Sequence, residues 1–212
     1  MIEVTEKEIF NLFPTPIYRG TVKDESFLDN LKNNVLAIKQ DTLGTEVSND
    51  VNFETPDDLH ERPEFQGLSE LVLQESEKIL NHFKLIRDSH YITGMWSMIS
   101  GNNFSHQLHN HANCYLSGLI YLNAPVGCGN LVFRDPRPAR SAMTYEYQEH
   151  DGLNSQSYYF KPKKGSIIFW PHWMDHGVER GTYVGDENRI MIAFNIMVRT
   201  EIKIKTSKLI LR

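Results

Sequence analysis

Cysteine is scarce in this sequence of 212 residues, and the pairs that usually hold structural metals are missing. The only two cysteines are Cys114 and Cys128, and neither belongs to a CxxC pair. Structural zinc sites commonly group their ligands in such pairs, and small disulfide-stabilised folds need several bridges. The sequence therefore disfavours both classes. We expect two free, buried thiols in a reducing compartment.

The sequence also lacks a basic surface and a long apolar run. Its formal net charge is −5, whereas a protein dedicated to nucleic acid needs positive charge for phosphate contacts. The N-terminal stretch MIEVTEKEIFNLF has neither the basic start nor the apolar core of a signal peptide. No apolar stretch approaches the roughly 20 residues that span a bilayer. We therefore expect a cytoplasmic protein without nucleic-acid or membrane partners.

The remaining composition is that of an ordinary globular protein, with 40% hydrophobic and 23% charged residues and no internal repeat. The length suits a single domain over residues 1–212. We expect a helical flank over 1–89 and a β-core over 90–200. Residues 201–212 alternate apolar and charged side chains, which predicts a C-terminal edge strand or tail.

Two segments of the N-terminal part have the apolar spacing of amphipathic helices. The first runs from Ser26 to Lys39, and the second runs from Gln66 to Phe83. Between them, Asp41 to Glu64 is polar and contains two prolines, which predicts a loop.

From His90 onward the pattern changes to short runs rich in β-branched and aromatic residues. These runs are YITGMWSMIS, CYLSGLIYLN, NLVFRD, SYYF, GSIIFW and RIMIAFNIMV, with turn residues between them. Such runs predict an antiparallel sandwich or barrel. Helices first and strands after them give a mainly β, α+β fold. The stretch from Arg137 to Ser157 predicts an unusually long loop, and such loops are often functional.

The stretch SHQLHNHANCYLSG carries three histidines within six residues: His106, His109 and His111. On a strand, side chains alternate between faces, so His109 and His111 project to one side and His106 to the other. Two imidazoles so placed can chelate one metal ion. Solvated loop histidines are the alternative.

A second cluster, PHWMDHGVE, follows the apolar run GSIIFW and contributes His172, Asp175 and His176. Metal sites on β-scaffolds commonly combine two ligands from one strand with a distant third. For His172 we favour a loop residue bonded to a backbone carbonyl group. Asp175 could instead complete a metal's ligand set.

Arg189 opens the apolar run RIMIAFN, thirteen residues after His176. A partly buried guanidinium requires an anion, and it binds carboxylates through two parallel hydrogen bonds. A small-molecule carboxylate is one candidate. A salt bridge to Asp186 or Glu187 is the other.

Together these pieces resemble a known family. In order they are HxH, SGLIYLN, GNLVFRDPRP, GSIIFWP, the downstream histidine and RIMIAFN. The set, over roughly Trp96 to Val198, resembles the iron(II)- and 2-oxoglutarate-dependent oxygenases. It is most similar to a poorly characterised bacterial and phage branch related to prolyl 4-hydroxylases, as is FPTPIY, Phe13 to Tyr18. The resemblance implies a double-stranded β-helix (jelly roll) core with N-terminal flanking helices.

The resemblance also implies a metal site. His109 stands at the first iron ligand and His176 at the distal one. His111 stands where most of the superfamily has Asp or Glu, so the site would hold Fe(II) with three imidazoles. Two histidines and one carboxylate are the usual set.

The same resemblance places Arg189 where a basic residue holds the distal carboxylate of 2-oxoglutarate. Tyr121 is a plausible hydroxyl donor to that carboxylate, and Ser117 and Asn123 are weaker candidates. Met191 stands where a serine is often found. The implied activity is hydroxylation of a small-molecule or peptide substrate, coupled to oxidative decarboxylation of 2-oxoglutarate. A homodimer is compatible with the sequence.

Several alternatives stay open. A cupin-like three-histidine metalloprotein without 2-oxoglutarate is one, and a non-catalytic jelly-roll binding module is another. Phe133, Phe169 and Phe194 could wall the site or simply pack in the core. Arg134, Arg137 and Arg140 could bind an acidic substrate, and the loop over 137–157 could close as a lid.

Overall fold

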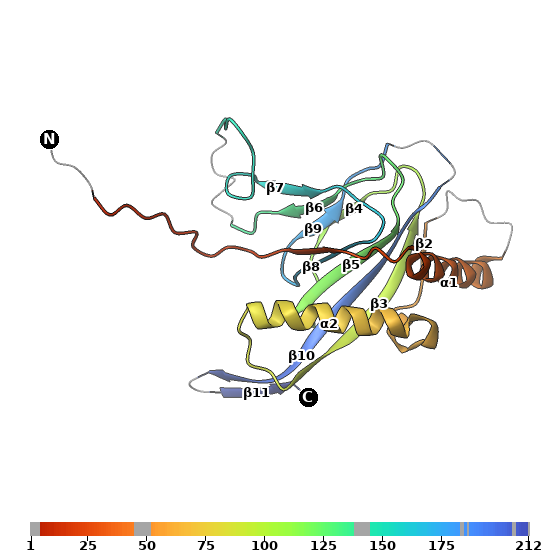
Figure 1. Ribbon diagram of the computed structural model, residues 1–212, viewed down its shortest axis with the longest axis horizontal. Coiled ribbons are helices and arrows are strands. Elements are labelled where there is room, and N and C mark those ends of the chain that lie inside the picture. The colour runs from red at the N-terminus through yellow and green to blue at the C-terminus, as the bar shows by residue number, and fades with distance from the viewer. Residues whose placement is uncertain are drawn as a thin grey trace.

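The computed structural model describes residues 5–44, 52–137, 145–182, 185, 187–204 and 207–211. A larger sheet has the strand order β1-β8-β5-β10-β3-β2, with β11 paired to β10, and a smaller sheet has the order β4-β9-β6-β7 (Figure 1). All the strand pairs are antiparallel. The strands are β1 (Tyr18–Thr21), β2 (Phe53–Glu54), β3 (Ser89–Ser100), β4 (His106–His109), β5 (Leu116–Asn123), β6 (Leu131–Arg134), β7 (Ser157–Phe160), β8 (Ser166–Pro171), β9 (His176–Val178), β10 (Arg189–Ile204) and β11 (Ser207–Leu211).

The path of the chain identifies the architecture. From β3 to β10 it passes between the larger and the smaller sheet in the order larger, smaller, larger, smaller, smaller, larger, smaller, larger. This symmetric winding of two sheets is a jelly roll. The predicted fold class, a mainly β jelly roll with N-terminal helices, is confirmed.

Two helices back the larger sheet. Helix α1 (Glu25–Leu43) begins after Asp24, whose carboxylate accepts the backbone N–H of Phe27 at 3.0 Å and so caps the helix. Helix α2 spans Gln66–His82 and crosses the sheet in Figure 1. Their buried residues pack on one face of the sheet. The predicted α2 is confirmed to within one residue. Helix α1 ends four residues beyond the prediction, because its last turn is mostly polar and does not continue the apolar spacing on which the prediction rested.

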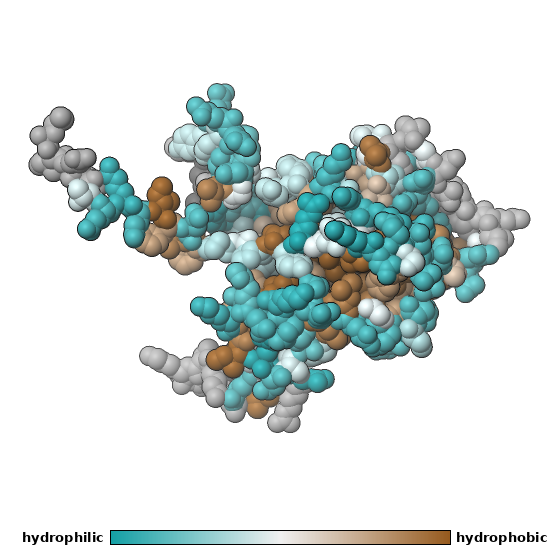
Figure 2. Space-filling view, in the orientation of Figure 1, coloured by the Kyte–Doolittle hydropathy of each residue, from teal (hydrophilic) through white to brown (hydrophobic). Residues whose placement is uncertain are grey.

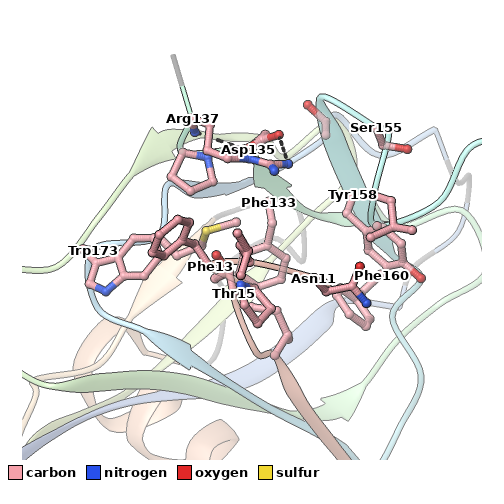
Figure 3. A pocket seen from close by; sticks show the side chains of 18 of the residues that line it. Asn11, Phe13, Thr15, Phe133, Asp135, Arg137, Ser155, Tyr158, Phe160 and Trp173 are labelled. Carbon is pink, nitrogen blue, oxygen red and sulfur yellow. Dashed lines mark hydrogen bonds and ion pairs between the residues drawn. The ribbon is translucent and has the colours of Figure 1, made fainter. Parts of the chain in front are cut away.

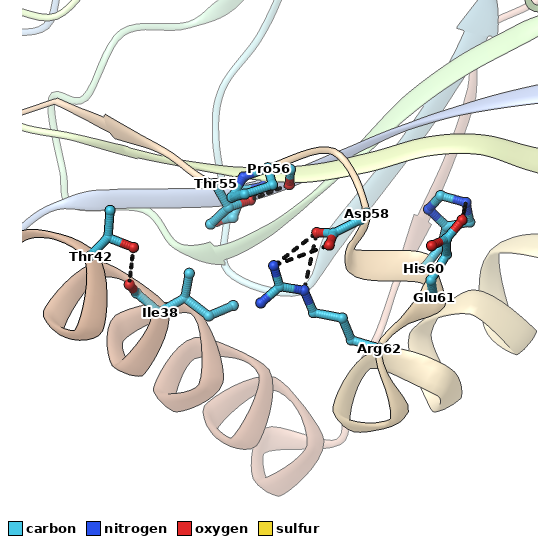
Figure 4. Close-up of polar contacts among 9 residues, drawn as sticks. Ile38, Thr42, Thr55, Pro56, Asp58, His60, Glu61 and Arg62 are labelled. Atoms are coloured by element: carbon cyan, nitrogen blue, oxygen red, sulfur yellow. Dashed lines mark hydrogen bonds and ion pairs between the residues drawn. The ribbon is translucent and has the colours of Figure 1, made fainter.

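Residues 52–65, the described part of the predicted polar loop before α2, contain regular structure. They include β2 and two short 3-10 helices, η1 (Leu59–Glu61) and η2 (Pro63–Phe65). Leu59 is fully buried, and Arg62 donates hydrogen bonds to both carboxylate oxygens of Asp58, at 3.0 and 3.2 Å (Figure 4). Single buried apolar residues in a polar stretch hold this segment against the rest of the protein. Because these residues have no regular spacing, the sequence did not predict its strand and 3-10 helices.

The two faces of the larger sheet bury different cores. One core lies under the helices. The other lies between the sheets and joins residues of β5, β8 and β10 to Leu131 and Phe133 of β6. The inter-sheet core also receives Tyr121 and Met191, which are register partners on β5 and β10. Candidate site residues therefore gather between the sheets. None of the helices in the described part of the chain has the length and apolar character needed to cross a bilayer.

Candidate metal centre and anion pocket

His109 and His176 are direct cross-strand neighbours. They are register partners at the junction of β4 and β9, and their ring centroids lie 4.3 Å apart. Directly opposite residues of an antiparallel pair have their side chains on the same face, about 4.5–5.5 Å apart at Cβ. The strand pairing alone therefore brings together residues that are far apart in the sequence.

His111 reaches the same place by a different route from the predicted one. Strand β4 ends at His109, so strand alternation does not reach His111. The backbone N–H of His111 instead donates to the carbonyl oxygen of His172 at 3.1 Å. The ring Nδ1 of His172 donates in return to the carbonyl oxygen of His111 at 2.8 Å. His172 is thus bonded to a backbone carbonyl group, as expected, and it fixes the main chain of His111.

The predicted placement of His106 on the opposite face is wrong. The pairing of β4 with β9 shifts register between His106 and His109, so the regular alternation of side chains is interrupted there. The two rings lie 4.3 Å apart between centroids. His106 therefore packs beside His109 at the solvent-exposed edge of the cluster.

One nitrogen from each of His109, His111 and His176 converges on a common point. These atoms all lie within 4.8 Å of one another, and the Nε2 atoms of His111 and His176 are 3.2 Å apart. Two nitrogens bound to one metal at about 2.1 Å, with an angle between 90° and 109°, are roughly 3.0–3.4 Å apart. The separation of this pair therefore matches that of two ligands of one ion.

Backbone carbonyl groups orient two of these rings. Nδ1 of His109 lies 2.9 Å from the carbonyl oxygen of Gln107, and Nδ1 of His176 lies 3.0 Å from that of Met174. A carbonyl oxygen only accepts, so each Nδ1 carries the proton and each neutral ring keeps its Nε2 lone pair free. Both rings are held in the tautomer that binds a metal through Nε2.

The environment keeps two of the histidines neutral. Burial, followed by the charges of neighbouring histidines, lowers the pKa of His111 from 6.5 to about 4. Burial is also the main cause that lowers the pKa of His176 to about 3. Neutral imidazole is the form that binds metals, so at pH 7 protons do not compete for these nitrogens.

Asp175 lies outside this cluster. Its Oδ1 accepts a hydrogen bond from Nδ2 of Asn110 at 2.8 Å, and its carboxylate is not among the converging ligand atoms. Among the described residues, the converging set is three imidazoles without a carboxylate.

Arg189 is a buried cation with incomplete hydrogen bonding. It is 2% exposed, and Nη2 donates to the hydroxyl oxygen of Tyr121 at 3.3 Å. Among the described residues, its Nε and Nη1 have no hydrogen-bond partner. The salt-bridge alternative finds no support among the described acids, since none pairs with Arg189, and Asp186 lies outside the described residues. A buried guanidinium without a counter-ion is costly, so the pocket calls for an anion.

Tyr121 complements that cation. It is fully buried, and its pKa is raised mainly by burial, so the phenol keeps its proton. Because the guanidinium donates to the phenol oxygen, the hydroxyl proton stays available for another acceptor. An oxygen anion beside Arg189 would accept it.

Ser117 and Asn123 have partners within the protein. The Ser117 hydroxyl donates to Oδ1 of Asn195 at 2.9 Å, and Nδ2 of Asn123 donates to the carbonyl oxygen of Asn188 at 2.8 Å. Both bonds tie β5 to β10 or to the residue just before it. These contacts indicate that both side chains help to hold β5 against β10, before and after Tyr121 along β5.

Aromatic side chains surround the histidines. The ring of Trp170 lies 4.7 Å from that of His176, and the ring of Phe133 lies 6.1 Å from it. Phe169 and Phe194 instead pack in the core under the helices. Trp170 is buried, and its Nε1 has no hydrogen-bond partner in the part of the chain that the structure describes. Its place in the apolar run before His176 was the only sequence signal for it.

The donor set fits a metal and an organic anion together. Imidazole nitrogens suit iron, nickel and zinc, and the buried guanidinium with its unpartnered N–H groups suits a carboxylate. The positive charge of Arg189, after burial and His109, lowers the pKa of His106. The guanidinium therefore acts electrostatically on His106, which packs beside His109.

Comparison with known proteins agrees with this chemistry. Residues 94–195 match the family described as "Putative 2OG-Fe(II) oxygenase". That stretch contains the three converging histidines, Arg189 and Tyr121. A search of curated proteins found no match.

Solved structures share the fold at low sequence identity. The 2-oxoglutarate-dependent epimerase SnoN of nogalamycin biosynthesis is 12% identical with a TM-score of 0.63, over 88% of this chain and 77% of that one. A prolyl 4-hydroxylase of Pseudomonas putida is 11% identical with a TM-score of 0.61, over 88% and 94%. HygX of Streptomyces hygroscopicus, with nickel and 2-oxoglutarate bound, is 12% identical with a TM-score of 0.59, over 87% and 83%.

These findings favour neither the cupin-like nor the non-catalytic alternative. The match lies over the strands that carry the histidines and Arg189, and the fold is shared with HygX, which has been solved with iron and with nickel and 2-oxoglutarate. Residues 94–195, which carry the histidines and Arg189, belong to the family of iron(II)- and 2-oxoglutarate-dependent oxygenases.

Proposed function

We propose that this oxygenase is a hydroxylase that holds Fe(II) through His109, His111 and His176 and binds 2-oxoglutarate through Arg189 and Tyr121. The observation that carries the proposal is the common location of two features. Three imidazole nitrogens lie within 4.8 Å of one another, and the buried guanidinium of Arg189, which has no acidic partner among the described residues, contacts Tyr121 of the inter-sheet core.

Iron and 2-oxoglutarate, when bound, supply the oxidation: 2-oxoglutarate and dioxygen are consumed, and succinate, carbon dioxide and hydroxylated substrate are formed. The side chains of this chain provide binding and orientation. Arg189, through Nε and Nη1, and Tyr121, through its hydroxyl proton, would hold the distal carboxylate of 2-oxoglutarate. The rings of Trp170 and Phe133 exclude water from the side of His176.

His111 gives this site its distinct charge. An imidazole in place of a carboxylate leaves the bound metal one unit more positive. The two hydrogen bonds between His111 and His172 hold the main chain of His111 in place without help from a strand. We propose that the added positive charge favours binding of the dianionic cosubstrate.

The substrate is a small molecule or a peptide, and we place the protein in the cytoplasm. Both cysteines are free and buried, which agrees with a reducing compartment. Nothing in the described residues calls for a nucleic-acid or membrane partner, and a homodimer stays compatible with this proposal.

Anaerobic titration of 2-oxoglutarate into the Fe(II) protein tests the proposal through its visible charge-transfer band. We expect Arg189→Met to weaken 2-oxoglutarate binding by about tenfold or more, since a lost charged hydrogen bond costs about 1.5–3 kcal/mol. Methionine retains much of the buried apolar volume, and circular dichroism checks the fold.

Arg134→Met is the matched control, because Arg134 is exposed at the end of β6. It should leave the affinity unchanged. Equal 2-oxoglutarate affinity in Arg189→Met and the wild-type protein would contradict the role of Arg189.

A further inference from the structure

A cavity of about 840 Å³ opens at the edge of the sandwich where β7 ends the smaller sheet. Its walls come from residues 10–17, from β6 and residues 135–137, from residues 152–160, and from Trp173 and Met174 (Figure 3). This volume lies within the range of sites for small organic ligands, about 300–1,000 Å³.

The cavity adjoins the histidine cluster. Phe133 lines it and is the register partner of His176 across β6 and β9. Met174 also lines it, and the carbonyl oxygen of Met174 accepts the Nδ1 proton of His176. A group bound in the cavity would therefore contact Phe133 and Met174, which are direct neighbours of His176.

The described lining carries no unpaired charge. Its only charged side chains are Asp135 and Arg137, and these pair with each other through two bonds, Nε to Oδ1 at 2.9 Å and Nη2 to Oδ2 at 2.8 Å. Arg137 is thus engaged, which weakens the expectation of an acidic substrate, and Arg140 lies outside the described residues. A charged group entering among Phe133, Tyr158 and Phe160 would lose water without gaining a counter-ion.

The outer wall of the cavity belongs to an N-terminal arm, residues 5–13. Its apolar side chains are unusually exposed, with Ile9 at 97%, Phe10 at 71% and Phe13 at 89%. Figure 2 shows hydrophobic, brown atoms on the projecting arm. Phe13 has a φ of +60°, in the left-handed region that is unfavourable for an aromatic residue. Just beyond it, Ile17 packs into the inter-sheet core, so the arm is anchored at its inner end.

We infer that this cavity takes an uncharged apolar or aromatic group of the substrate, and that Phe10 and Phe13 of the arm pack onto the bound group. The assignment as a substrate site rests on the proposed function, whereas the binding itself does not. Burying these exposed side chains against a ligand removes apolar surface from water and lets Phe13 leave its strained conformation.

A pair of dyes that differ by one charge tests the chemistry of the cavity. N-phenyl-1-naphthylamine is neutral, and 8-anilinonaphthalene-1-sulfonate is its sulfonated counterpart. Fluorescence titration in high salt, which screens the net charge of the protein, should give at least about tenfold tighter binding of the neutral dye. Equal affinities, or tighter binding of the sulfonate, would overturn the inference.

Paired variants test the arm. Phe10→Ser combined with Phe13→Ser should weaken binding of the neutral dye by about tenfold, since two apolar contacts are lost. Ile86→Ser is the matched control, because Ile86 is also 89% exposed but lies outside the cavity lining. Unchanged dye affinity in the arm variant would remove the arm from the site.

Metal substitution separates this inference from the proposed function. With Mn(II) in place of iron, the proton NMR signals of the bound neutral dye should broaden relative to those with Zn(II). Dye that binds a Mn(II)-loaded protein without broadening would contradict the link between cavity and metal. Failure to bind Mn(II) or Zn(II) would instead count against the proposed function, and the dye pair would still decide what the cavity binds.

The source of the group is resolved by competition. Displacement of the dye by a neutral pentapeptide, blocked at both ends and with a central phenylalanine, assigns the group to a polypeptide. Displacement by N-acetylphenylalanine amide alone assigns it to a free small molecule.

Discussion

At the scale of single residues, His111 shows why a motif does not fix a geometry. Strand alternation correctly groups it with His109, but the reason was wrong, because β4 ends at His109 and His111 lies beyond the strand. The bonds between His111 and His172 could not be read from the sequence. They join main-chain and ring atoms 61 residues apart, and neither residue type requires such a partner.

The buried histidines predict how the stability of the metal-free protein changes with pH. The pKa of His176 is about 3 in the folded chain, below its ordinary value of 6.5. Between these values the unfolded chain binds the proton and the folded chain does not. The stabilising contribution is therefore present above pH 6.5 and is lost as the pH falls.

We expect the free energy of unfolding to drop by about 2 kcal/mol between pH 7 and pH 5 from His176 alone. Urea denaturation in the presence of a chelator measures it. His176→Asn keeps a donor for the carbonyl group of Met174 but does not titrate, so its loss between the two pH values should be smaller by that amount. A His176→Asn variant with the pH profile of the wild-type protein would contradict the low pKa.

At the scale of elements, the pairing of β4 with β9 positions two of the three proposed ligands, and Gly177 is essential to it. A Cβ atom at Gly177 would lie 2.7 Å from the carbonyl oxygen of His106 and 3.2 Å from backbone atoms of Gln107. Backbone atoms cannot move aside as a flexible side chain can. We therefore expect Gly177→Ala to push β4 away from β9 and separate His109 from His176.

Calorimetric titration with Ni(II) tests this expectation. Gly177→Ala should bind Ni(II) at least about tenfold more weakly than the wild-type protein, comparable to the loss of groups that orient metal ligands. Gly152→Ala is the control, since a Cβ there meets nothing within 4 Å. Wild-type affinity in Gly177→Ala would show that the strand pairing does not position the site.

The elements also show which parts of a fold a sequence reveals. The long apolar strands β5, β8 and β10 and helix α2 were predicted because they bury continuous or regularly spaced apolar faces. The short strand β9 was not predicted, and β4 was only assumed when strand alternation paired His109 with His111, because both strands are short and carry histidines. The resemblance was needed to add His176 as the distal ligand.

At the scale of the whole molecule, the two cores differ in what they contribute. The core under the helices is made of apolar side chains packed between α1, α2 and the larger sheet. The core between the sheets instead has the buried Arg189 and three clustered imidazoles at its margin. Unpaired polar groups of this kind lower stability until a partner binds. Binding of ligands at the site should therefore raise the stability of the folded protein.

This difference predicts strong stabilisation by metal and cosubstrate together. Ligands that bind only the folded state at about 100 times their Kd add about 2.7 kcal/mol, which for a chain of this size raises the Tm by roughly 5–10 °C. Differential scanning fluorimetry with Ni(II) and 2-oxoglutarate measures the shift. His111→Ala should abolish most of it, whereas Ile86→Ser, at an exposed position away from the site, should keep it in full. A full shift in His111→Ala would mean that the metal binds elsewhere, because a site with two imidazoles and no carboxylate lacks the third ligand that holds the ion.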